Sequence, residues 1–436
     1  MNRPLSTLSP NVGSRSRGRG FTLVELMVAM AAGLVVAAAA MLLAKNASQF
    51  FQYEARISAA QLGLTLGMNR ITQDLQRAAL LSSPNIQRDS TSGLLCGDVT
   101  TYPVGLQQLA GIHIIQGGSA VNTPQSVAND LNPDILIVGG SLSTTEQFAV
   151  RSTSLAAGGS VVLRLEDDDA MKRVRVRARA AAGAGEDIAK LFRIGRFLRI
   201  IDQDFKHEYG VISQLSQGPS TDPYVDVTLA ANPAVPTNPP GLCGLHGHET
   251  GALVSVVYRV QYELRGMLGD QNYGVLVAPV TPSLTGDNGR TELVRTELDE
   301  QDVPLLPNNT QAPPELVVEY AVDLKFGLES AVWDPVTSTF AANRYPIRIP
   351  EDASVYSIAA SVAGGGTPET VRAVQVRFST RARAPDRAVD LDIDQGLAPD
   401  GRLSRFFLND VIAPPTFART RTLYTDVSLP NQAGVQ

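Results

Sequence analysis

The sequence predicts an α+β fold, in which one long N-terminal helix packs on an antiparallel, β-rich body. Two features of the 436-residue chain support this prediction. No proline occurs between Thr22 and Ser83, so no residue of that kind interrupts a helix there. After Pro84 the chain changes to short runs rich in β-branched and aromatic residues, separated by Gly, Pro, Asn and Asp.

The start of the chain joins a basic segment to a long apolar one. Residues 1–20 contain four arginines and no acidic residue. Residues 21–44 form an apolar stretch of 24 residues, and a helix of this length measures about 36 Å, enough to cross a hydrocarbon layer of about 30 Å. Because basic segments tend to stay in the cytoplasm, we expect a single-pass inner-membrane protein whose body after Lys45 lies in the periplasm.

A cleavable secretory signal is the main alternative for this segment. Such a signal has small residues at a cleavage site directly after its apolar part. Ala37–Ala40 is instead followed by Met41, Leu42 and Leu43, and the helical pattern continues. The sequence therefore favours a helix that stays attached and spans the membrane.

Glu25 is the only ionisable side chain between Phe21 and Ala44. A carboxylate at full depth in a membrane costs about 2–3 kcal/mol, and it usually has a partner. Glu25 is either hydrated at the cytoplasmic boundary or paired with a cation from another chain. A free α-amino group on Phe21, created by cleavage after Gly20, would be such a cation.

The six residues from Gly20 to Glu25, GFTLVE, resemble the class III signal of type IV prepilins and type II secretion pseudopilins. The shared features are a basic leader ending in Gly, an aromatic first mature residue and a Glu at the fifth mature position. The resemblance implies that residues 1–20 are a leader, that prepilin peptidase cleaves between Gly20 and Phe21, and that Phe21 is N-methylated.

The same resemblance implies a set of partners. Other major and minor pilins would pack against the N-terminal helix, and an inner-membrane platform would assemble them into a pilus or pseudopilus at the cell surface. A tip adhesin is a further candidate partner.

Residues 45–83 are predicted to form the amphipathic half of the helix. An apolar stripe recurs there at helical spacing. Its members are Ile57, Leu64, Met68, Ile71, Leu75 and Ala78. Gln61 interrupts the stripe, and Gly63 and Gly67 each weaken the helix by up to about 1 kcal/mol. We expect this stripe to pack against a sheet.

The body is predicted to consist of a β-rich region 84–310 and a C-terminal β-rich region 311–436. Proline-rich breaks at 232–241 and 304–314 are the candidate boundaries. The clearest expected strands are 111–116, 134–139, 160–165, 196–201, 253–264, 316–326 and 370–380. The Asn-Gly pair within 287–290 predicts a tight turn.

The order of these elements resembles PilW-type minor pilins and, more loosely, the large J-type pseudopilin. Residues 257–260 and 292–296 resemble their pair of a tyrosine-containing strand followed by an arginine. Further similar segments are 192–202, 314–320 and 419–424. The body is longer than that of a typical major pilin, which favours a low-copy position that initiates or caps a filament.

Two cysteines, Cys96 and Cys243, permit one disulfide if the body is exported. Cys243 also belongs to a cluster with His246, His248 and Glu249, and zinc accepts all of these groups. The cluster lies in a glycine-rich loop without a second ligand pair nearby. We therefore favour a loop whose cysteine is free or in a disulfide, and we expect no metal and no cofactor.

Four arginines alternate through residues 173–179, which we expect to form one face of a strand. Such a face could bind nucleic acid without sequence preference. A solvated face paired with the acidic residues 166–169 is the favoured interpretation, because the chain has a net charge of −6. Nucleic acid is therefore an unlikely partner.

Other motifs for chemistry are weak or missing. Asp390, Asp392 and Asp394 precede Gly396 in a calcium-loop spacing, but the Gly and Glu that an EF-hand needs at its sixth and twelfth positions are missing. No phosphate-binding loop or nucleophile elbow occurs, and the chain has four histidines. We expect a structural protein rather than an enzyme: a minor pilin, or alternatively a type II secretion pseudopilin, or a membrane-anchored module that binds DNA or a surface ligand.

Overall fold

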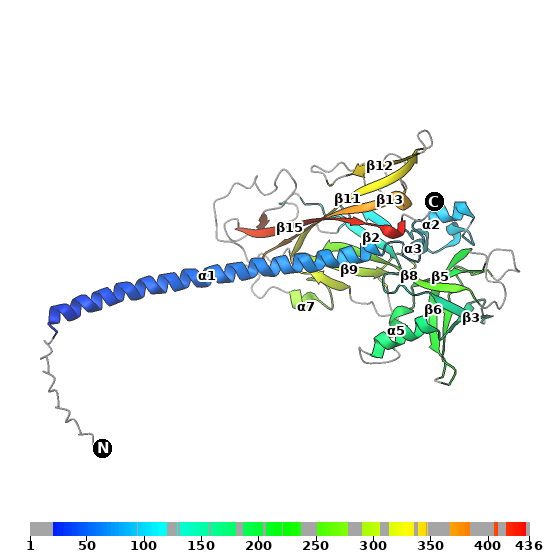
Figure 1. The fold of residues 1–436 in the computed structure, drawn as a ribbon, viewed down its shortest axis with the longest axis horizontal. Coiled ribbons are helices and arrows are strands. Elements are labelled where there is room, and N and C mark those ends of the chain that lie inside the picture. Colours follow the sequence, from blue (N-terminus) through cyan, green and yellow to red (C-terminus); the bar gives the residue numbers. More distant parts are fainter. Residues whose placement is uncertain are drawn as a thin grey trace, which may run out of the picture. The chain divides into compact units, whose positions relative to one another are not determined.

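The computed structural model describes residues 21–93, 95–119, 129, 131–156, 158–179, 186–203, 206–219, 221–236, 251–277, 290–305, 314–334, 339–345, 347, 367–383, 405–408 and 416–432. The chain divides into two compact units, Met1–Ala55 and Arg56–Gln436, each with most of its residue contacts inside itself. A long helix followed by an antiparallel β-rich body confirms the predicted α+β class (Figure 1).

Helix α1 (Leu23–Gln76) is continuous over 54 residues and belongs to both units. It ends before Ser83, the last residue of the expected helical segment. Ala79 and Leu81 adopt left-handed conformations with φ of 59° and 51°, which a helix cannot contain. The N–H of Ala79 donates to the carbonyl oxygen of Gly139 at 2.8 Å, so a neighbouring strand replaces the helical acceptor.

The predicted apolar stripe of α1 is confirmed. All six members are buried, from Ile57 with 8% of its surface exposed to Ile71, Leu75 and Ala78 with 0%. From Leu64 onward they belong to the largest hydrophobic cluster, which they share with residues of both sheets. The second half of α1 is therefore part of the core of the body.

Ten strands form the larger sheet, and all of their pairings are antiparallel. The strands are β1 (Ile112–Ile115), β2 (Ile135–Gly140), β3 (Phe148–Leu155), β4 (Val161–Glu166), β5 (Phe197–Ile201), β6 (His207–Gln217), β7 (Tyr224–Leu229), β8 (Leu253–Arg265), β9 (Glu292–Leu298) and β10 (Glu315–Val318). The start of β8 pairs with both β3 and β5, so that β8, β3, β4, β7, β6 and β5 close into a ring. The end of β8 leaves this ring and pairs with β2 and β9.

Two short helices cover the closed ring of strands. Helix α5 (Asp169–Arg179) buries Met171 and Val174, and helix α6 (Glu186–Leu191) buries Ile188 and Leu191. These side chains share one hydrophobic cluster with the inward-facing residues of the ring.

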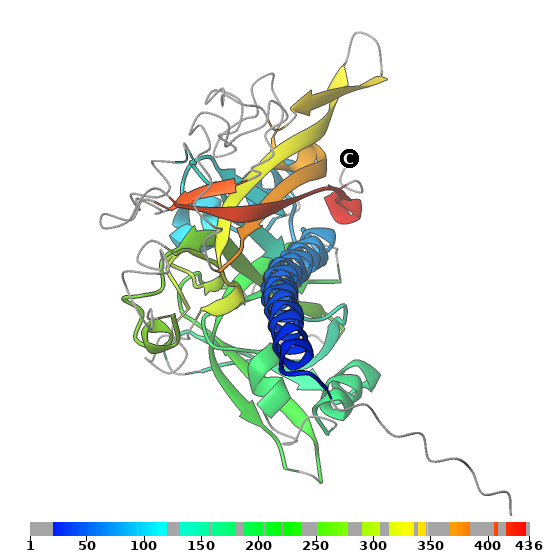
Figure 2. The same ribbon diagram turned by 90° about the vertical axis from the view of Figure 1, so that its left-hand side faces the viewer.

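The smaller sheet has five strands in the order β12-β11-β13-β15-β14. They are β11 (Ala321–Asp334), β12 (Thr339–Tyr345), β13 (Val371–Arg381), β14 (Arg405–Leu408) and β15 (Thr416–Ser428). This sheet lies next to the second half of α1 (Figure 2), and the hydroxyl of Thr380 donates to the carbonyl oxygen of Ala60 at 3.0 Å. The remaining elements are α2 (Ile86–Ser92), η1 (Val99–Thr101), α3 (Val104–Gln107), α7 (Gly274–Val277), η4 (Pro368–Thr370) and η6 (Pro430–Gln432).

Most of the predicted strands agree with the structure within a few residues. The run 316–326 is divided into β10 and β11, because Tyr320 has a φ of 57° and turns the chain. Strand β10 still pairs with β9 in the larger sheet, so the smaller sheet begins after the expected boundary at 311. The expected turn at 287–290 lies outside the described residues, except for Arg290.

The prediction of a strand at 173–179 is wrong, because these residues belong to α5. The carboxylate of Asp168 accepts the N–H of Met171 at 2.8 Å and so caps the first turn of the helix. Met171 and Val174 are then buried at helical spacing, which alternation with arginine had obscured. Arg173 forms an ion pair with Glu146 at 2.7 Å rather than with residues 166–169.

Candidate functional site

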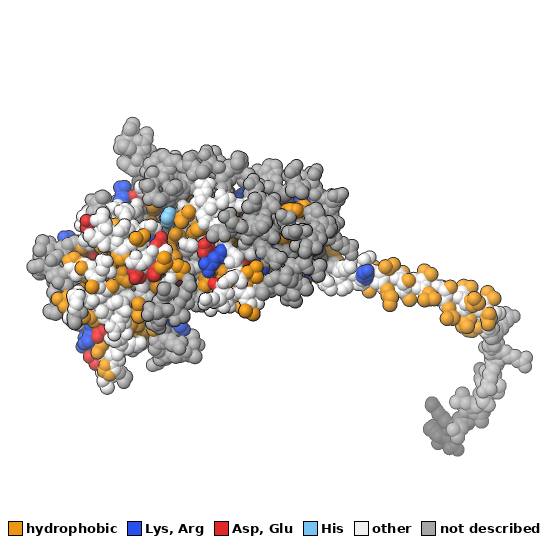
Figure 3. Space-filling model, turned by 180° about the vertical axis from the view of Figure 1, so that it is seen from behind, with side chains coloured by type: hydrophobic (Ala, Val, Ile, Leu, Met, Phe, Trp, Pro, Cys, Tyr) orange, Lys and Arg blue, Asp and Glu red, His pale blue; other side chains and the backbone are white. Residues whose placement is uncertain are grey.

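The N-terminal part of α1 presents an apolar surface to its surroundings. Every described residue from Phe21 to Ala55 whose burial is defined is exposed, including large side chains such as Leu34 at 70% and Leu43 at 72%. Figure 3 shows hydrophobic side chains along this part of the helix. By length and composition α1 could cross a membrane, and none of its most apolar stretch is buried as a soluble core helix would be.

Thr22 and Glu25 form a reciprocal cap at the start of α1. The backbone N–H and the hydroxyl of Thr22 donate to Glu25 Oε2 at 2.9 and 3.0 Å, and the Glu25 N–H donates to Thr22 Oγ1 at 3.2 Å. This arrangement is a capping box, which satisfies N–H groups that the first helical turn leaves free. In the single chain, Thr22 therefore supplies the polar partner that Glu25 needs.

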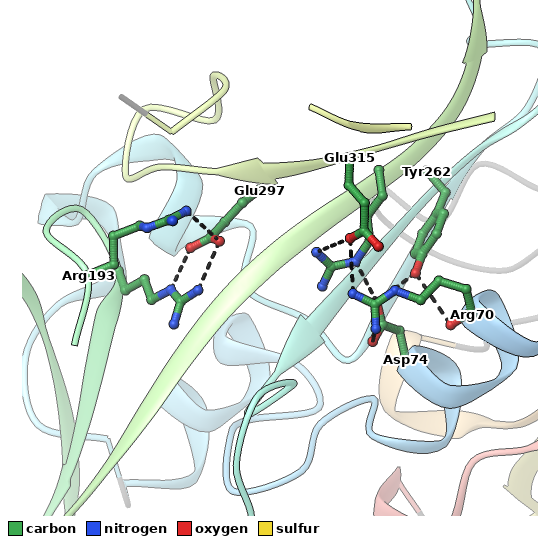
Figure 4. A network of polar contacts seen from close by, with 8 residues as sticks. Arg70, Asp74, Arg193, Tyr262, Glu297 and Glu315 are labelled. Carbon is green, nitrogen blue, oxygen red and sulfur yellow. Dashed lines mark hydrogen bonds and ion pairs between the residues drawn. The ribbon is translucent and has the colours of Figure 1, made fainter. Parts of the chain in front are cut away.

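A buried polar network joins α1 to the larger sheet (Figure 4). Asp74, with 2% of its surface exposed, accepts hydrogen bonds from the Tyr262 hydroxyl at 2.6 Å and from Arg295 Nε at 2.8 Å. Arg70, one turn earlier on α1, donates to Glu315 of β10 at 3.0 Å. Glu315 also contacts Arg295 at 3.3 Å, which links the two halves of the network.

The protonation of Tyr262 supports its role as a donor. Burial, together with the nearby carboxylate of Asp74, raises the pKa of Tyr262 well above its usual value. The phenol therefore keeps its proton and donates to Asp74. Figure 4 also shows a second network, in which Arg193 and Arg196 hold Glu297 of β9, with Arg196 Nη2 and Glu297 Oε2 2.9 Å apart.

These networks consist of ion pairs and hydrogen bonds that position elements. Within the described parts of the chain, no group of three or more His, Cys, Asp or Glu side chains could hold a metal ion. Among the described residues, the first network attaches α1 to the larger sheet, and the second attaches the segment before β5 to β9.

Of the three residues predicted for processing and assembly, the structure describes Phe21 and Glu25 but not Gly20. Phe21 has 88% of its surface exposed, directly before the capping box of Glu25. Gly20 lies outside the described residues. The cleavage and methylation of this segment therefore stay predictions.

Cys96 is disulfide-bonded and lies beside β6, where its N–H donates to the carbonyl oxygen of His207 at 2.8 Å. Cys243 is the other cysteine of the chain and lies outside the described residues, so its pairing with Cys96 stays a prediction. The candidate zinc ligands His246, His248 and Glu249, and the calcium-like segment from Asp390 through Asp392 and Asp394 to Gly396, also lie outside them.

Four of the five segments that resemble PilW-type pilins fall on the paired strands β5, β8, β9 and β10 of the larger sheet, and the fifth falls on β15 of the smaller sheet. Residues 257–260 lie in β8 and 292–296 in β9, and these two strands pair. The tyrosine opposite Arg295 is Tyr262, which lies two residues after the segment, and not Tyr258 within it. Residues 192–202 include β5, 314–320 include β10, and 419–424 lie in β15. Their arrangement brings the expected tyrosine and arginine strands together.

Sequence analysis missed the capping box and Asp74. The capping box has a readable signal, since Thr22-Leu-Val-Glu25 is a Thr followed three residues later by a Glu. Asp74 lies three residues after Ile71 and one before Leu75, inside the apolar stripe. A carboxylate at such a position indicates a buried partner, although its identity cannot be read from the sequence.

Residues 15–41 match the family described as the prokaryotic N-terminal methylation motif. The chain carries a prepilin-type signal. This signal supports a type IV pilin-like protein that is anchored in a membrane, processed by prepilin peptidase and assembled with other pilins. It points to a structural subunit rather than an enzyme. Neither the curated proteins nor the solved structures contain a match to the chain.

Proposed function

We propose that this type IV pilin-like protein is a minor pilin that helps to initiate or cap a type IV pilus. The observation that carries the proposal is the prepilin-type signal at 15–41, followed by an exposed apolar helix that continues into the core of a large β-rich body. The resemblance of β5, β8, β9, β10 and β15 to PilW-type pilins supports the minor-pilin role. So does the size of the body, which would crowd a filament built from this chain alone.

The processing step can be tested directly. We expect mass spectrometry of membrane or filament protein to find a mature chain that begins with N-methylated Phe21, with Gly20 removed. Gly20→Ala should be a mild change because Ala is the next smallest residue, whereas a bulky residue at this position should block cleavage. A mature chain that begins near Lys45 would contradict the prepilin interpretation.

Glu25 is proposed to pair with the α-amino group of Phe21, on a neighbouring subunit or on its own chain. In the filament this amine would replace Thr22 as the partner of the carboxylate, since an unpaired carboxylate between packed apolar helices is costly. Glu25→Val should leave membrane insertion and leader removal largely intact, because the peptidase acts at Gly20. It should reduce recovery of the subunit in sheared filaments by about tenfold, equivalent to about 1.4 kcal/mol. Normal incorporation of this variant would rule out the pairing.

A type II secretion pseudopilin is the second candidate, since it would share the signal and the helix. The two roles differ in the effect of deleting the gene. Loss of a minor pilin should sharply reduce surface filaments and leave protein secretion unchanged. Loss of a pseudopilin should block secretion and leave surface filaments unchanged.

A membrane-anchored module that binds DNA or a surface ligand is the third candidate. Helix α5 supplies its basic residues, but Arg173 is already held by both oxygens of Glu146, at 2.9 and 2.7 Å. We therefore expect the full chain in detergent to show no DNA affinity even at low salt. Salt-sensitive binding that is lost in Lys172→Glu would favour the module.

A further inference from the structure

Three aromatic residues, Phe50, Phe51 and Tyr53, lie on α1 beyond its apolar stretch. Phe50 and Phe51 have 62% and 71% of their surfaces exposed, and their ring centroids are 6.3 Å apart in an edge-to-face arrangement. The five residues before them, from Lys45 to Gln49, are mostly polar. The pair is therefore an exposed apolar feature that follows a mostly polar segment of the helix.

The length of the helix indicates the depth of this pair in a membrane. Glu25 and Lys45 are the charged residues that bound the apolar stretch, and they are 20 residues apart. At about 1.5 Å per residue this separation is about 30 Å, the thickness of the hydrocarbon core. Phe50 lies five residues further along, about 8 Å beyond Lys45, where each headgroup layer is about 5–8 Å thick.

The direction of helical side chains brings the rings closer to the hydrocarbon. Each Cα–Cβ bond of a helix tilts toward its N-terminus, and long side chains follow that direction. The rings of Phe50 and Phe51 therefore extend back toward the membrane span, into the zone between headgroups and acyl chains. Aromatic side chains on interfacial helices occupy this zone in general.

We propose that Phe50 and Phe51 are an interfacial anchor, which binds the phospholipid headgroup boundary of the leaflet on the side of the body. The occupant is lipid because only the five residues from Lys45 to Gln49 separate the pair from the apolar surface of residues 21–44, whose described residues are exposed throughout. With Lys45 between them and the span, the two rings fix how far α1 emerges from the membrane. The proposal rests on membrane insertion of α1 and holds for a pilus or a pseudopilus subunit.

Depth-dependent fluorescence quenching tests this anchor in the full chain. Trp333 is the single tryptophan, so Trp333→Phe gives a dark background. Phe50→Trp in that background is reconstituted into phosphatidylethanolamine and phosphatidylglycerol vesicles brominated either near the headgroup or near the chain ends. Val35→Trp is the matched control, because Val35 lies midway between Glu25 and Lys45.

We expect the shallow bromines to quench Phe50→Trp at least about twofold more than the deep ones, and the order to reverse for Val35→Trp. Red-shifted emission of Phe50→Trp without quenching would place the ring in water and overturn the proposal. The same order as Val35→Trp would place it inside the hydrocarbon, with the same consequence. Quenching that rises when the protein is diluted in lipid would assign the rings to a second copy of the chain and would also overturn it.

Discussion

Asp74 is the residue on which the attachment of α1 to the larger sheet depends most. Its carboxylate accepts a hydrogen bond from the Tyr262 hydroxyl at 2.6 Å, and it holds the guanidinium of Arg295, whose side chain is 10% exposed. Removing one partner of a buried ion pair leaves the other charge without compensation.

We predict that Asp74→Asn lowers the free energy of unfolding by about 1.5–3 kcal/mol, because Asn keeps the shape but removes the charge that holds Arg295 Nε, while Glu315 at 3.3 Å still compensates part of the Arg295 charge. Denaturant unfolding of the full chain in detergent measures the change. Asp222→Asn is the control, since Asp222 and Arg151 are about half exposed and such pairs contribute about 0–1 kcal/mol. Equal effects of the two substitutions would contradict the role of Asp74.

Glu263, unlike Asp74, is expected to lower the stability of the fold at neutral pH. Burial raises the pKa of Glu263, and the nearby Arg265 only partly offsets this rise. A carboxyl whose folded pKa is raised stabilises the fold when protonated, and this contribution is lost as the pH rises through the folded pKa. We therefore predict that Glu263→Gln becomes more stable relative to the parent chain between pH 4 and pH 7. Unfolding curves at both pH values measure this, and a constant difference would contradict it.

At the scale of elements, the close approach of α1 to the sheets requires a glycine. A Cβ at Gly67 would lie 2.5 Å from Val318 Cγ2 and 2.8 Å from Phe378 Cε1, both closer than van der Waals contact permits. At Gly63, one turn earlier, the nearest atom would be Val318 Cγ1 at 3.4 Å. Both glycines weaken the isolated helix, but in the folded chain only Gly67 lies too close to the sheets to accept a side chain.

We predict that Gly67→Ala lowers the free energy of unfolding by about 1–3 kcal/mol, because overpacking exceeds the gain in helix propensity of up to about 1 kcal/mol. Gly63→Ala is the matched control and should be neutral or stabilising by up to about 1 kcal/mol. Thermal unfolding of both variants measures the difference. A stabilised Gly67→Ala chain would show that α1 can shift away from Val318 and Phe378.

Elements that carry a strong period were predictable from the sequence. The stripe from Ile57 to Ala78 falls where expected, because burial of one helical face dictates its pattern. The strands at 253–264 and 370–380 also fall where expected, because their runs rich in β-branched residues suit strands that are buried over most of their length. Helix α5 was mistaken for a strand, since alternating arginine and valine imitates period two and its cap, Asp168, lies within an acidic run. The ring of strands in the larger sheet could not be predicted, because pairings such as β5 with β8 join distant segments.

At the scale of the whole molecule, the prepilin-type signal and the residues that pack into the body lie in different parts of α1. Among the described residues of α1, every buried one lies at or after Ile57, and residues 21–55 belong to a separate unit. The signal at 15–41 therefore lies in a part of the chain that the core does not need. The part that follows Arg56 supplies one face of the largest hydrophobic cluster.

We predict that a fragment of residues 56–436 folds and stays soluble, whereas a fragment of residues 84–436 does not. The shorter fragment loses the α1 stripe, in which each fully buried side chain contributes about 1.5–3 kcal/mol. Several such losses reach the total stability of about 5–15 kcal/mol that folded domains have. In the shorter fragment, Arg295 and Tyr262 also lose the hydrogen bonds that they donate to Asp74 of α1. Dispersed amide spectra and a cooperative unfolding transition should distinguish the two fragments. A folded 84–436 fragment would show that the sheets form their core without α1, and α1 would then be an appendage of the body.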